Sequence, residues 1–463
     1  MSVTSLTLAF HGATGTVTGS RFVVATPRSS VLVDAGLFQG LRQLRRRNWD
    51  PIPFDPAMLD AVVVSHAHLD HTGYLPVVVR GGFGGRISAT GDTVRLAELI
   101  LRDSAKLQEE DASYAARAGF SKHARPKPLY DQHDVDLTVP LLQPVDFDTA
   151  VELSEDVVAR LRPAGHILGS ASVLLEHDRG TVLFSGDLGR SQHPLLRPPE
   201  PPPSVETLVL ESTYGNRRHP RSEAAREALA DVIGRTVERG GTVVIPAFAV
   251  DRTEVLLVAL RELFASGAIP PVPVFLDSPM ALQVLDIYRD ALSGGRPDVR
   301  PGVVDAMDVL GLREAHTADA SRALNEPDEP SVLISASGMA TGGRVVHHLK
   351  HLLPHPDNSI VLVGYQAEGT RGRDLVDGAA ALKMHGRYIP VRAEICQIEG
   401  FSVHADEDEL IAWAGQMAEA PTTTYVVHGE PEASRALVRR IRGDLGWNAV
   451  APRHGEVVRI DRG

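Results

Sequence analysis

The segment His66-Ala67-His68-Leu69-Asp70-His71 constrains this chain more than any other part of it. It follows the apolar run Ala61 to Val64, which is typical of a buried strand. A strand that ends in three histidines and an aspartate can direct two histidines toward one metal ion and the Asp-His pair toward a second. One histidine in such a loop is common, whereas this density of ligands is rare. The segment therefore predicts a metal site.

The rest of the chain limits which ligands such a site can use. Cys396 is the only cysteine, so disulfides within the chain are excluded and a metal must be held by histidine and carboxylate. Zinc suits such nitrogen and oxygen donors. Further candidates lie at the ends of other predicted strands, and they are His166, Asp187 and His428. Any one of them alone would more often be a structural residue, but together they complete two sites.

The rhythm of the sequence changes near the proline-rich stretch Arg197 to Pro203. Before it, short β-branched runs end in turns. After it, strands and helices alternate, beginning with a predicted strand at Thr207 to Leu210, which is typical of a parallel, doubly wound sheet. A chain of 463 residues is long enough for two cores. We predict an inserted domain at residues 206–390, between residues 1–205 and 391–463 of a first domain.

Charge and hydropathy exclude some classes of protein. The net charge of −12 argues against a protein that coats duplex DNA with a broad basic surface. It leaves RNA open, because a nuclease needs only a local basic channel and bound metal ions add positive charge. No apolar run reaches membrane-spanning length, and Met1 to Phe10 lacks the pattern of a signal peptide. We expect a cytoplasmic protein without a membrane partner.

With these residues in place, the chain resembles the metallo-β-lactamase superfamily, whose defining motifs are the His-x-His-x-Asp-His loop, a later histidine and a bridging aspartate. The resemblance implies an αββα sandwich that holds two zinc ions per chain. It divides the ligands into a first group (His66, His68 and His166), a second group (Asp70, His71 and His428) and a bridge (Asp187). Asp34 matches the first acidic motif and would orient a ligand imidazole by hydrogen bonding.

The predicted insertion resembles the β-CASP domain, an α/β domain with a parallel sheet. Three marks carry this resemblance: Glu211 in Leu210-Glu211-Ser212-Thr213-Tyr214-Gly215, His404 in Phe401-Ser402-Val403-His404-Ala405-Asp406, and His428. Further matches at Ser335 to Met339 and Gly369 to Arg373 extend the similarity over nearly the whole chain. The chain is most similar to bacterial and archaeal ribonucleases related to the catalytic subunit of messenger-RNA 3′-end cleavage, which implies single-stranded RNA as the substrate.

The expected reaction is hydrolysis of a phosphodiester bond by a hydroxide that bridges two zinc ions. Its catalytic residues would be Asp70, Asp187, Glu211 and His404. His404 would act as the general acid that protonates the departing ribose oxygen, since the neighbouring carboxylate of Glu211 favours a charged imidazole. A purely structural pairing of Glu211 with His404 is the competing interpretation.

Substrate phosphates would be bound within the insertion. The backbone N–H groups of Ser337, Gly338 and Met339 could cradle a phosphate, although a plain strand-to-helix turn explains the same pattern. Arg373 is the expected arginine contact, because Arg371 stands where the family usually has an apolar residue. Cleavage within the strand is favoured over removal of nucleotides from a 5′ end, and a homodimer is left open.

Two other functions remain in view. A thioester or lactone hydrolase would use the same ligands, but it has no need for Glu211, His404 or a large insertion. A non-catalytic RNA-binding subunit would not need the complete ligand set. Two signals are discounted: the histidines from His347 to His355 are interpreted as a solvated helix face, and Arg45-Arg46-Arg47 is too short to indicate a nucleic-acid site.

Overall fold

The computed structural model describes residues 5–118, 126–364 and 366–461. The chain forms two compact units. Unit 1 comprises Met1–Gln39, Gln43–Arg218 and His404–Gly463, and unit 2 comprises Gly40–Arg42 and His219–Val403. None of the helices in these described segments is both long enough and apolar enough to cross a membrane.

Unit 1 contains two seven-stranded sheets. The first has the order β22 (Val457–Arg459), β1 (Thr7–Phe10), β2 (Phe22–Ala25), β3 (Ser30–Val33), β4 (Ala61–Val63), β5 (Arg86–Thr90) and β6 (Leu142–Val145). The second has the order β21 (Ala449–Val450), β20 (Thr423–Val427), β11 (Thr207–Glu211), β10 (Gly180–Phe184), β9 (Ala171–His177), β8 (Val158–Pro163) and β7 (Val151–Glu152).

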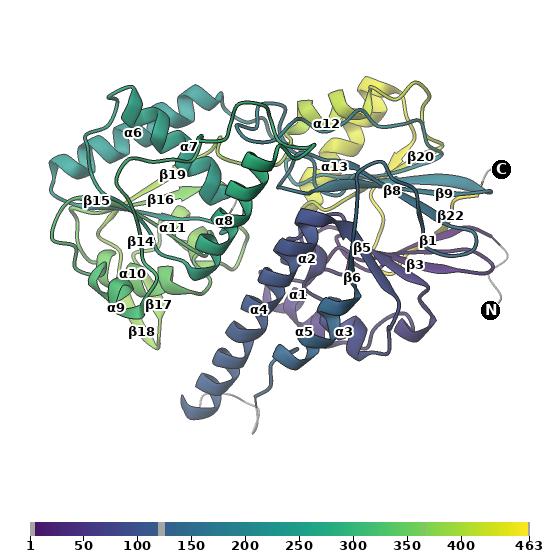
Figure 1. Ribbon diagram of the computed structural model, residues 1–463, viewed down its shortest axis with the longest axis horizontal. Coiled ribbons are helices and arrows are strands. Elements are labelled where there is room, and N and C mark those ends of the chain that lie inside the picture. The colour runs from purple at the N-terminus through teal and green to yellow at the C-terminus, as the bar shows by residue number, and fades with distance from the viewer. Residues whose placement is uncertain (1–4, 119–125, 365, 462–463) are drawn as a thin grey trace. The chain divides into compact units, whose positions relative to one another are not determined.

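The main core of unit 1 lies between these sheets. Phe22 of β2 packs on Phe184 of β10 with ring centroids 5.6 Å apart, and Phe10 of β1 packs on Tyr425 of β20 at 5.1 Å. Helices α3 (Leu75–Arg80), α4 (Gly91–Ala118) and α5 (Gln132–Thr138) cover the outer face of the first sheet (Figure 1). Helices α12 (Glu407–Ala414) and α13 (Pro431–Arg440) cover that of the second. The predicted αββα sandwich is confirmed.

Unit 2 is built on a six-stranded sheet whose described strand pairs are all parallel. Its order is β14 (Leu312–Glu314), β13 (Val274–Leu276), β15 (Ser331–Ser335), β12 (Thr242–Pro246), β16 (Ser359–Val363) and β19 (Glu394–Ile398). Helix α6 (Ser222–Glu238) and helix α10 (Arg344–Leu352) cover opposite faces (Figure 1). The connecting helices are α7 (Arg252–Ala265), α8 (Pro279–Gly294), α9 (Ala318–Ala323) and α11 (Arg371–Val376), and a hairpin joins β17 (Ala381–Met384) to β18 (Arg387–Pro390). The predicted parallel α/β architecture is confirmed.

The structure divides the chain later than the sequence suggested. The predicted strand Thr207 to Leu210 is not the first strand of the inserted domain. It is part of β11, which pairs with β10 and β20 inside unit 1. Conversely, β19 follows residue 391 but pairs with β16 in unit 2. The proline stretch and the change of motifs near Val391 mark loops, and the units separate after Arg218 and Val403.

The histidine-rich helix α10 is not simply a solvated face. His348 is fully buried, and its Nε2 lies 2.6 Å from Asp277 Oδ2, at the end of β13. The same carboxylate accepts hydrogen bonds from Ser321 and Arg344. The sequence interpretation is wrong for His348 because its partner lies far away in the chain. The network ties α9 and α10 to the sheet and has a structural explanation.

Candidate metal centre

The candidate ligands of unit 1 all lie at or just after the carboxyl ends of strands. The histidine loop leads from β4 into the short helix α2 (Leu69–Thr72), which carries Asp70 and His71. The other strand ends supply Asp34 after β3, His166 after β8, Asp187 after β10, Glu211 at the end of β11 and His428 after β20. Both sheets therefore present their functional side chains at the same edge of the sandwich.

The first group of ligand atoms comes from His66, His68, His166 and Asp187. His68 Nδ1 lies 3.2 Å from His66 Nε2 and 3.3 Å from His166 Nε2. Asp187 Oδ2 lies 3.5 Å from His66 Nε2 and 3.7 Å from His166 Nε2. Three nitrogens and one oxygen thus face a common point.

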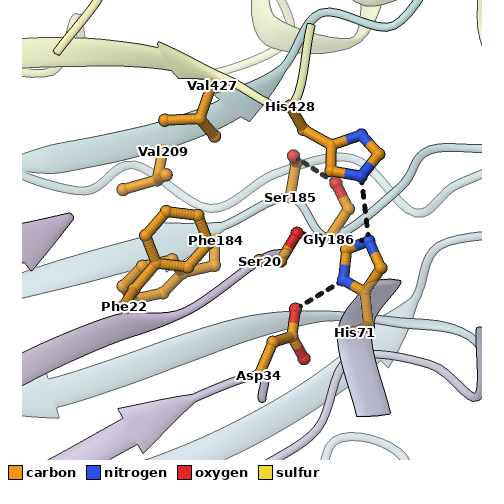
Figure 2. Close-up of a pocket in the computed structure, with 10 residues that line it drawn as sticks. All are labelled: Ser20, Phe22, Asp34, His71, Phe184, Ser185, Gly186, Val209, Val427 and His428. Carbon is orange, nitrogen blue, oxygen red and sulfur yellow. Dashed lines mark hydrogen bonds and ion pairs between the residues drawn. The ribbon is translucent and has the colours of Figure 1, made fainter. Parts of the chain in front are cut away.

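The second group comes from Asp70, His71 and His428. His428 Nε2 lies 3.2 Å from His71 Nε2 and 3.4 Å from Asp70 Oδ2. Figure 2 shows the imidazoles of His71 and His428 facing each other across a small pocket whose apolar side is formed by Phe22, Phe184, Val209 and Val427. The polar atoms converge at one end of this pocket.

Asp187 lies between the two groups. Its Oδ2 faces the first group, while its Oδ1 lies 3.4 Å from His71 Nε2 and 3.3 Å from His428 Nδ1. Burial raises the pKa of Asp187, but the imidazoles of His428 and His71 hold that pKa well below its usual value. The carboxylate is therefore ionised and offers one oxygen to each side.

Local backbone geometry places Asp187 there. Gly186 has φ +56°, and a Cβ at this position would meet Ala171 O at 2.9 Å and Ser65 Cβ at 3.0 Å. Glycine is the residue that accepts both this conformation and this close approach. The turn can therefore carry Asp187 from the end of β10 back toward the histidine loop.

These spacings fit a tetrahedral zinc ion. Nitrogen and oxygen ligands at about 2.0–2.2 Å from such an ion lie about 3.3–3.6 Å from one another. The ligand atoms of the two groups are separated by 3.2–3.7 Å. Burial lowers the pKa of His66 and of His68, which leaves neutral imidazoles that can donate a lone pair. The donor set and its geometry fit two neighbouring metal ions.

A second layer of side chains holds the ligands in place. Asp34 Oδ2 lies 2.7 Å from His71 Nδ1, and Asp34 also accepts hydrogen bonds from Ser65 N at 2.8 Å and Ser65 Oγ at 2.9 Å. Burial opposes a charge on His71, but Asp187 and Asp34 raise its pKa well above the usual value. Asp34 therefore fixes the His71 ring so that its Nε2 faces His428 (Figure 2).

Glu211 and His404 form a separate pair beside the metal ligands. His404 Nδ1 lies 3.4 Å from Glu211 Oε1 and 3.9 Å from Asp187 Oδ2. Glu211 is fully buried and accepts hydrogen bonds from Leu188 N at 2.8 Å and Thr213 N at 3.2 Å. The backbone of His404 forms an isolated antiparallel β-bridge with Gly189, and the His404 side chain is 18% exposed. A fixed carboxylate thus faces an imidazole that still reaches solvent.

Thr213 is a positioning residue that sequence reasoning missed. Its Oγ1 lies 3.1 Å from His428 Nδ1, which leaves His428 Nε2 directed toward Asp70 and His71. The signal was present, because Thr213 stands two residues after Glu211 in the quoted motif. It gave no role to the threonine, since the partner His428 is distant in the chain.

The residues predicted to bind phosphate lie in unit 2, away from the ligand set in sequence and in domain assignment. Ser337 to Met339 follow β15, but α10 begins only at Arg344, so they do not form the first turn of that helix. Arg373 forms an ion pair with Asp377 at 2.9 Å. Arg371, discounted from the sequence, donates hydrogen bonds to Ala340 O at 3.1 Å and Thr341 O at 3.0 Å. It supports the turn that follows Met339.

Family models match three segments of the chain. Residues 15–218 match the metallo-beta-lactamase superfamily, residues 253–375 match the Beta-Casp domain, and residues 388–452 match the Zn-dependent metallo-hydrolase RNA specificity domain. The first and third segments contain every ligand candidate of the two groups.

Several characterised proteins are similar over most of their length. A ribonuclease of Thermus thermophilus is 36% identical over 92% of this chain and 94% of its own. An RNase J-like protein of Methanocaldococcus jannaschii is 30% identical over 98% of this chain and 99% of its own. The transcription termination factor FttA of the same organism is 31% identical over 98% of this chain and 71% of its own.

A solved structure shares the fold. A protein of unknown function from Enterococcus faecalis V583 aligns with 98% of this chain and 100% of its own, with a TM-score of 0.52 and 15% sequence identity.

Proposed function

This chain belongs to the β-CASP ribonuclease family of the metallo-β-lactamase superfamily, and on that premise we propose that it is a zinc-dependent ribonuclease acting on single-stranded RNA. It hydrolyses phosphodiester bonds with two zinc ions per chain, and it cleaves within the strand. The observation that carries this proposal is the Glu211–His404 pair beside a complete double set of metal ligands.

The chemistry divides between the metal ligands and that pair. His66, His68 and His166 would hold one zinc ion, Asp70, His71 and His428 would hold the other, and Asp187 would bridge them. Bound zinc would supply Lewis acidity and would lower the pKa of a water molecule to about 7. Phosphodiester hydrolysis then still needs a proton for the departing ribose oxygen.

His404 meets that need in the proposal. Glu211 is held by two backbone N–H groups, so its carboxylate stays fixed beside His404 Nδ1. A carboxylate at this position orients the imidazole ring for proton transfer. Because His404 is partly exposed, it can reach a substrate in solution and transfer its proton there. Glu211 is thus a positioning residue, and His404 is the general acid.

Unit 2 is proposed to contribute phosphate contacts. The turn Ser337–Gly338–Met339 lies at the carboxyl edge of a parallel sheet, where ligands of α/β domains commonly bind. Phe248 packs so closely on Gly338 that a Cβ there would lie 2.7 Å from its ring. Arg373 would have to exchange its ion pair with Asp377 for a phosphate. These contacts hold the substrate and take no part in the chemical step.

The test uses labelled single-stranded RNA and three variants of the whole chain. His66→Ala combined with His68→Ala should abolish cleavage and reduce bound zinc. His404→Ala should retain zinc and lower kcat by about 10²–10⁴-fold, the usual range for a lost general acid. His133→Ala, an exposed histidine outside the site, is the control. Undiminished cleavage in either site variant would refute the assignment.

The same preparations separate the proposal from its alternatives. RNA labelled at either end shows whether products arise from internal cleavage or from stepwise removal at the 5′ end. Hydrolysis of a thioester or lactone with intact RNA would indicate a small-molecule hydrolase. Stoichiometric RNA binding without any product would indicate a binding subunit.

A further inference from the structure

Unit 1 has a cluster of basic and aromatic side chains at its surface, formed by two segments that are far apart in the sequence. We call it the basic patch and define it as Arg45, Arg46, Arg47, Trp49, Arg453 and His454. Phe38 joins the two segments, because the Arg47 guanidinium lies 5.4 Å from its ring and His454 lies 6.1 Å from it, centroid to centroid. The triple arginine, uninformative as a sequence motif, is therefore part of a larger surface.

The patch rests on a rigid base. Asn48 is buried, its Oδ1 accepts hydrogen bonds from Phe38 N at 2.9 Å and Arg21 Nη2 at 3.0 Å, and its Nδ2 donates to Phe38 O at 2.8 Å. Arg21 lies beneath, with its guanidinium 3.5 Å from the centre of the Tyr74 ring. Burial lowers the pKa of Arg21 to about 10, so it remains charged near neutral pH and adds positive potential under the surface.

The base of the patch is also connected to the metal centre. The segment from Asp34 to Phe38 runs from the residue that orients His71 to the ring beneath Arg47. Along it, Ala35 N donates to His71 O at 2.7 Å and Leu37 N donates to Leu69 O at 2.8 Å. A ligand on the patch would therefore bind next to the backbone segment that is hydrogen-bonded to the loop from His66 to His71.

The arginines of the patch differ from most arginines of this protein. Many others form ion pairs, as Arg95 does with Asp92 and Arg102 with Glu98. Within the described residues, none of the four patch arginines has a carboxylate within ion-pair distance. The acidic neighbours are Asp50, whose charge acts on His454, and Glu456, whose carboxylate accepts a hydrogen bond from Arg453 N. The patch therefore has a net positive charge on a chain with a net charge of −12.

Trp49 gives the patch its second property. Its exposure is 60%, whereas Trp413 is 5% exposed and Trp447 is half-buried. A large exposed aromatic ring among unpaired arginines suits a polyanion that carries flat rings. Single-stranded nucleic acid has this chemistry, because its phosphates bind arginine and its bases stack on aromatic side chains.

We propose that the basic patch is a second RNA-binding surface of this protein, on which arginines contact phosphates and Trp49 stacks on a base. This inference rests on the proposed ribonuclease function, and it assigns to unit 1 a substrate contact outside the metal centre. RNA long enough to reach the patch is held more tightly, while the chemical step is unaffected.

The test measures RNA affinity of the whole chain with a nuclease-resistant 2′-O-methyl RNA of about twenty nucleotides. Trp49→Ala should weaken binding about tenfold, since one stacked base contributes on the order of a tenfold change or more. Arg45→Gln with Arg46→Gln should lower the slope of log affinity against log salt by about 1.4, or about 0.7 for each lost phosphate contact. RNA should also quench the fluorescence of the parent protein and lose that effect with Trp49→Phe, which replaces the fluorophore.

Matched controls lie elsewhere in unit 1. Arg95→Gln with Arg102→Gln removes the same charge from paired arginines of α4, and Tyr114→Ala removes another exposed aromatic ring. Both controls should leave affinity and salt slope close to those of the parent. Equal losses in the controls and the patch variants would overturn the proposal, because they would reflect net charge or general surface change.

Failure of this proposal can be told apart from failure of the proposed function. A small phosphodiester, bis(p-nitrophenyl) phosphate, tests the metal centre without the patch, and its hydrolysis should be unchanged in the patch variants. If the parent cleaves RNA while the patch variants bind as tightly as the parent, the patch proposal alone is wrong. If the parent leaves RNA intact but binds it through Trp49 and the arginines, the proposed function is wrong and the patch proposal holds.

Discussion

Individual residues in this protein are placed by backbone conformations that few side chains adopt. Asp34 has φ +58° and His428 has φ +50°, and each directly follows a strand. Such left-handed conformations cost energy for residues other than glycine, and they concentrate at functional sites. The turn after β20 brings His428 toward Asp70 and His71 of the other sheet, and the turn after β3 brings Asp34 toward His71, whose loop follows the neighbouring strand β4. The strain is consistent with a site that holds its geometry before any metal binds.

The role assigned to Asp34 can be measured. Asp34→Asn keeps the shape and is tolerated at positive φ, but it removes the charge that faces His71 Nδ1. We expect zinc affinity to fall by about 10–100-fold, the usual effect of losing such a partner. Competition with a chromophoric chelator gives the affinity.

Thr213→Val should weaken zinc binding through His428 in the same way, whereas unchanged affinity in both variants would contradict the orienting role.

Many residues of the candidate site could be predicted from the sequence because the ligand candidates stand in short local patterns. His66 to His71 stand within one loop, and Asp187 follows a strand with a glycine between. The orienting hydroxyl of Thr213 could not be predicted, since its partner His428 is 215 positions away. His348 was misjudged for the same reason, because Asp277 is 71 positions away. A sequence pattern reports spacing along the chain, while these interactions depend on how distant segments meet.

Among the elements, helix α7 of unit 2 carries an unusual buried group. Glu254 is fully buried, and neither of its carboxylate oxygens has a hydrogen-bond partner of good geometry among the described residues. Burial raises the pKa of Glu254 well above the usual value of 4.5, and the nearby charge of Asp251 raises it further. Asp251 accepts a hydrogen bond from Tyr288 at 2.7 Å. The helix thus contains a carboxyl group whose burial favours its neutral form in the folded protein.

This arrangement predicts a pH-dependent stability. Glu254 contributes fully to the free energy of unfolding below about pH 4.5, where its carboxyl group is protonated in the unfolded chain as well. This stabilising contribution is lost as the pH rises toward the raised pKa of the folded state. Glu254→Gln removes this titration. It should raise the melting temperature at about pH 8 by a few degrees, on the order of 1–3 kcal/mol, with little difference at about pH 5.

Thermal unfolding of the metal-free protein at the two pH values provides the measurement. Glu262→Gln changes an exposed glutamate of the same helix and should shift neither melting temperature. An equal gain from Glu254→Gln at both pH values would show that the effect is one of packing, and that Glu254 is not a buried neutral acid.

Elements also show where sequence reasoning about the fold reaches its limit. The alternation of strands and helices predicted a parallel sheet correctly, because each strand and helix has its own local pattern. The assignment of β11 and β19 to their sheets could not be obtained in this way. An apolar strand has the same pattern whether its neighbours are β10 and β20 or the strands of another unit.

For the molecule as a whole, the last segment of unit 1 follows unit 2 along the chain. His404 and the ligand His428 follow the inserted unit, while the other metal-ligand candidates precede it. Correct assembly of the second ligand group therefore requires residues from both ends of the chain. This order of segments explains why the third family segment, at residues 388–452, is as necessary to the site as residues 15–218.

We propose that two zinc ions bound in unit 1 give the chain its activity on RNA. The most direct measurement is a titration of zinc into metal-free protein, with cleavage of labelled single-stranded RNA followed at each addition. We expect no cleavage without metal and a rise in cleavage that levels off at about two zinc ions per chain, as the two ligand groups require. Intact RNA in the presence of fully zinc-loaded protein would contradict it.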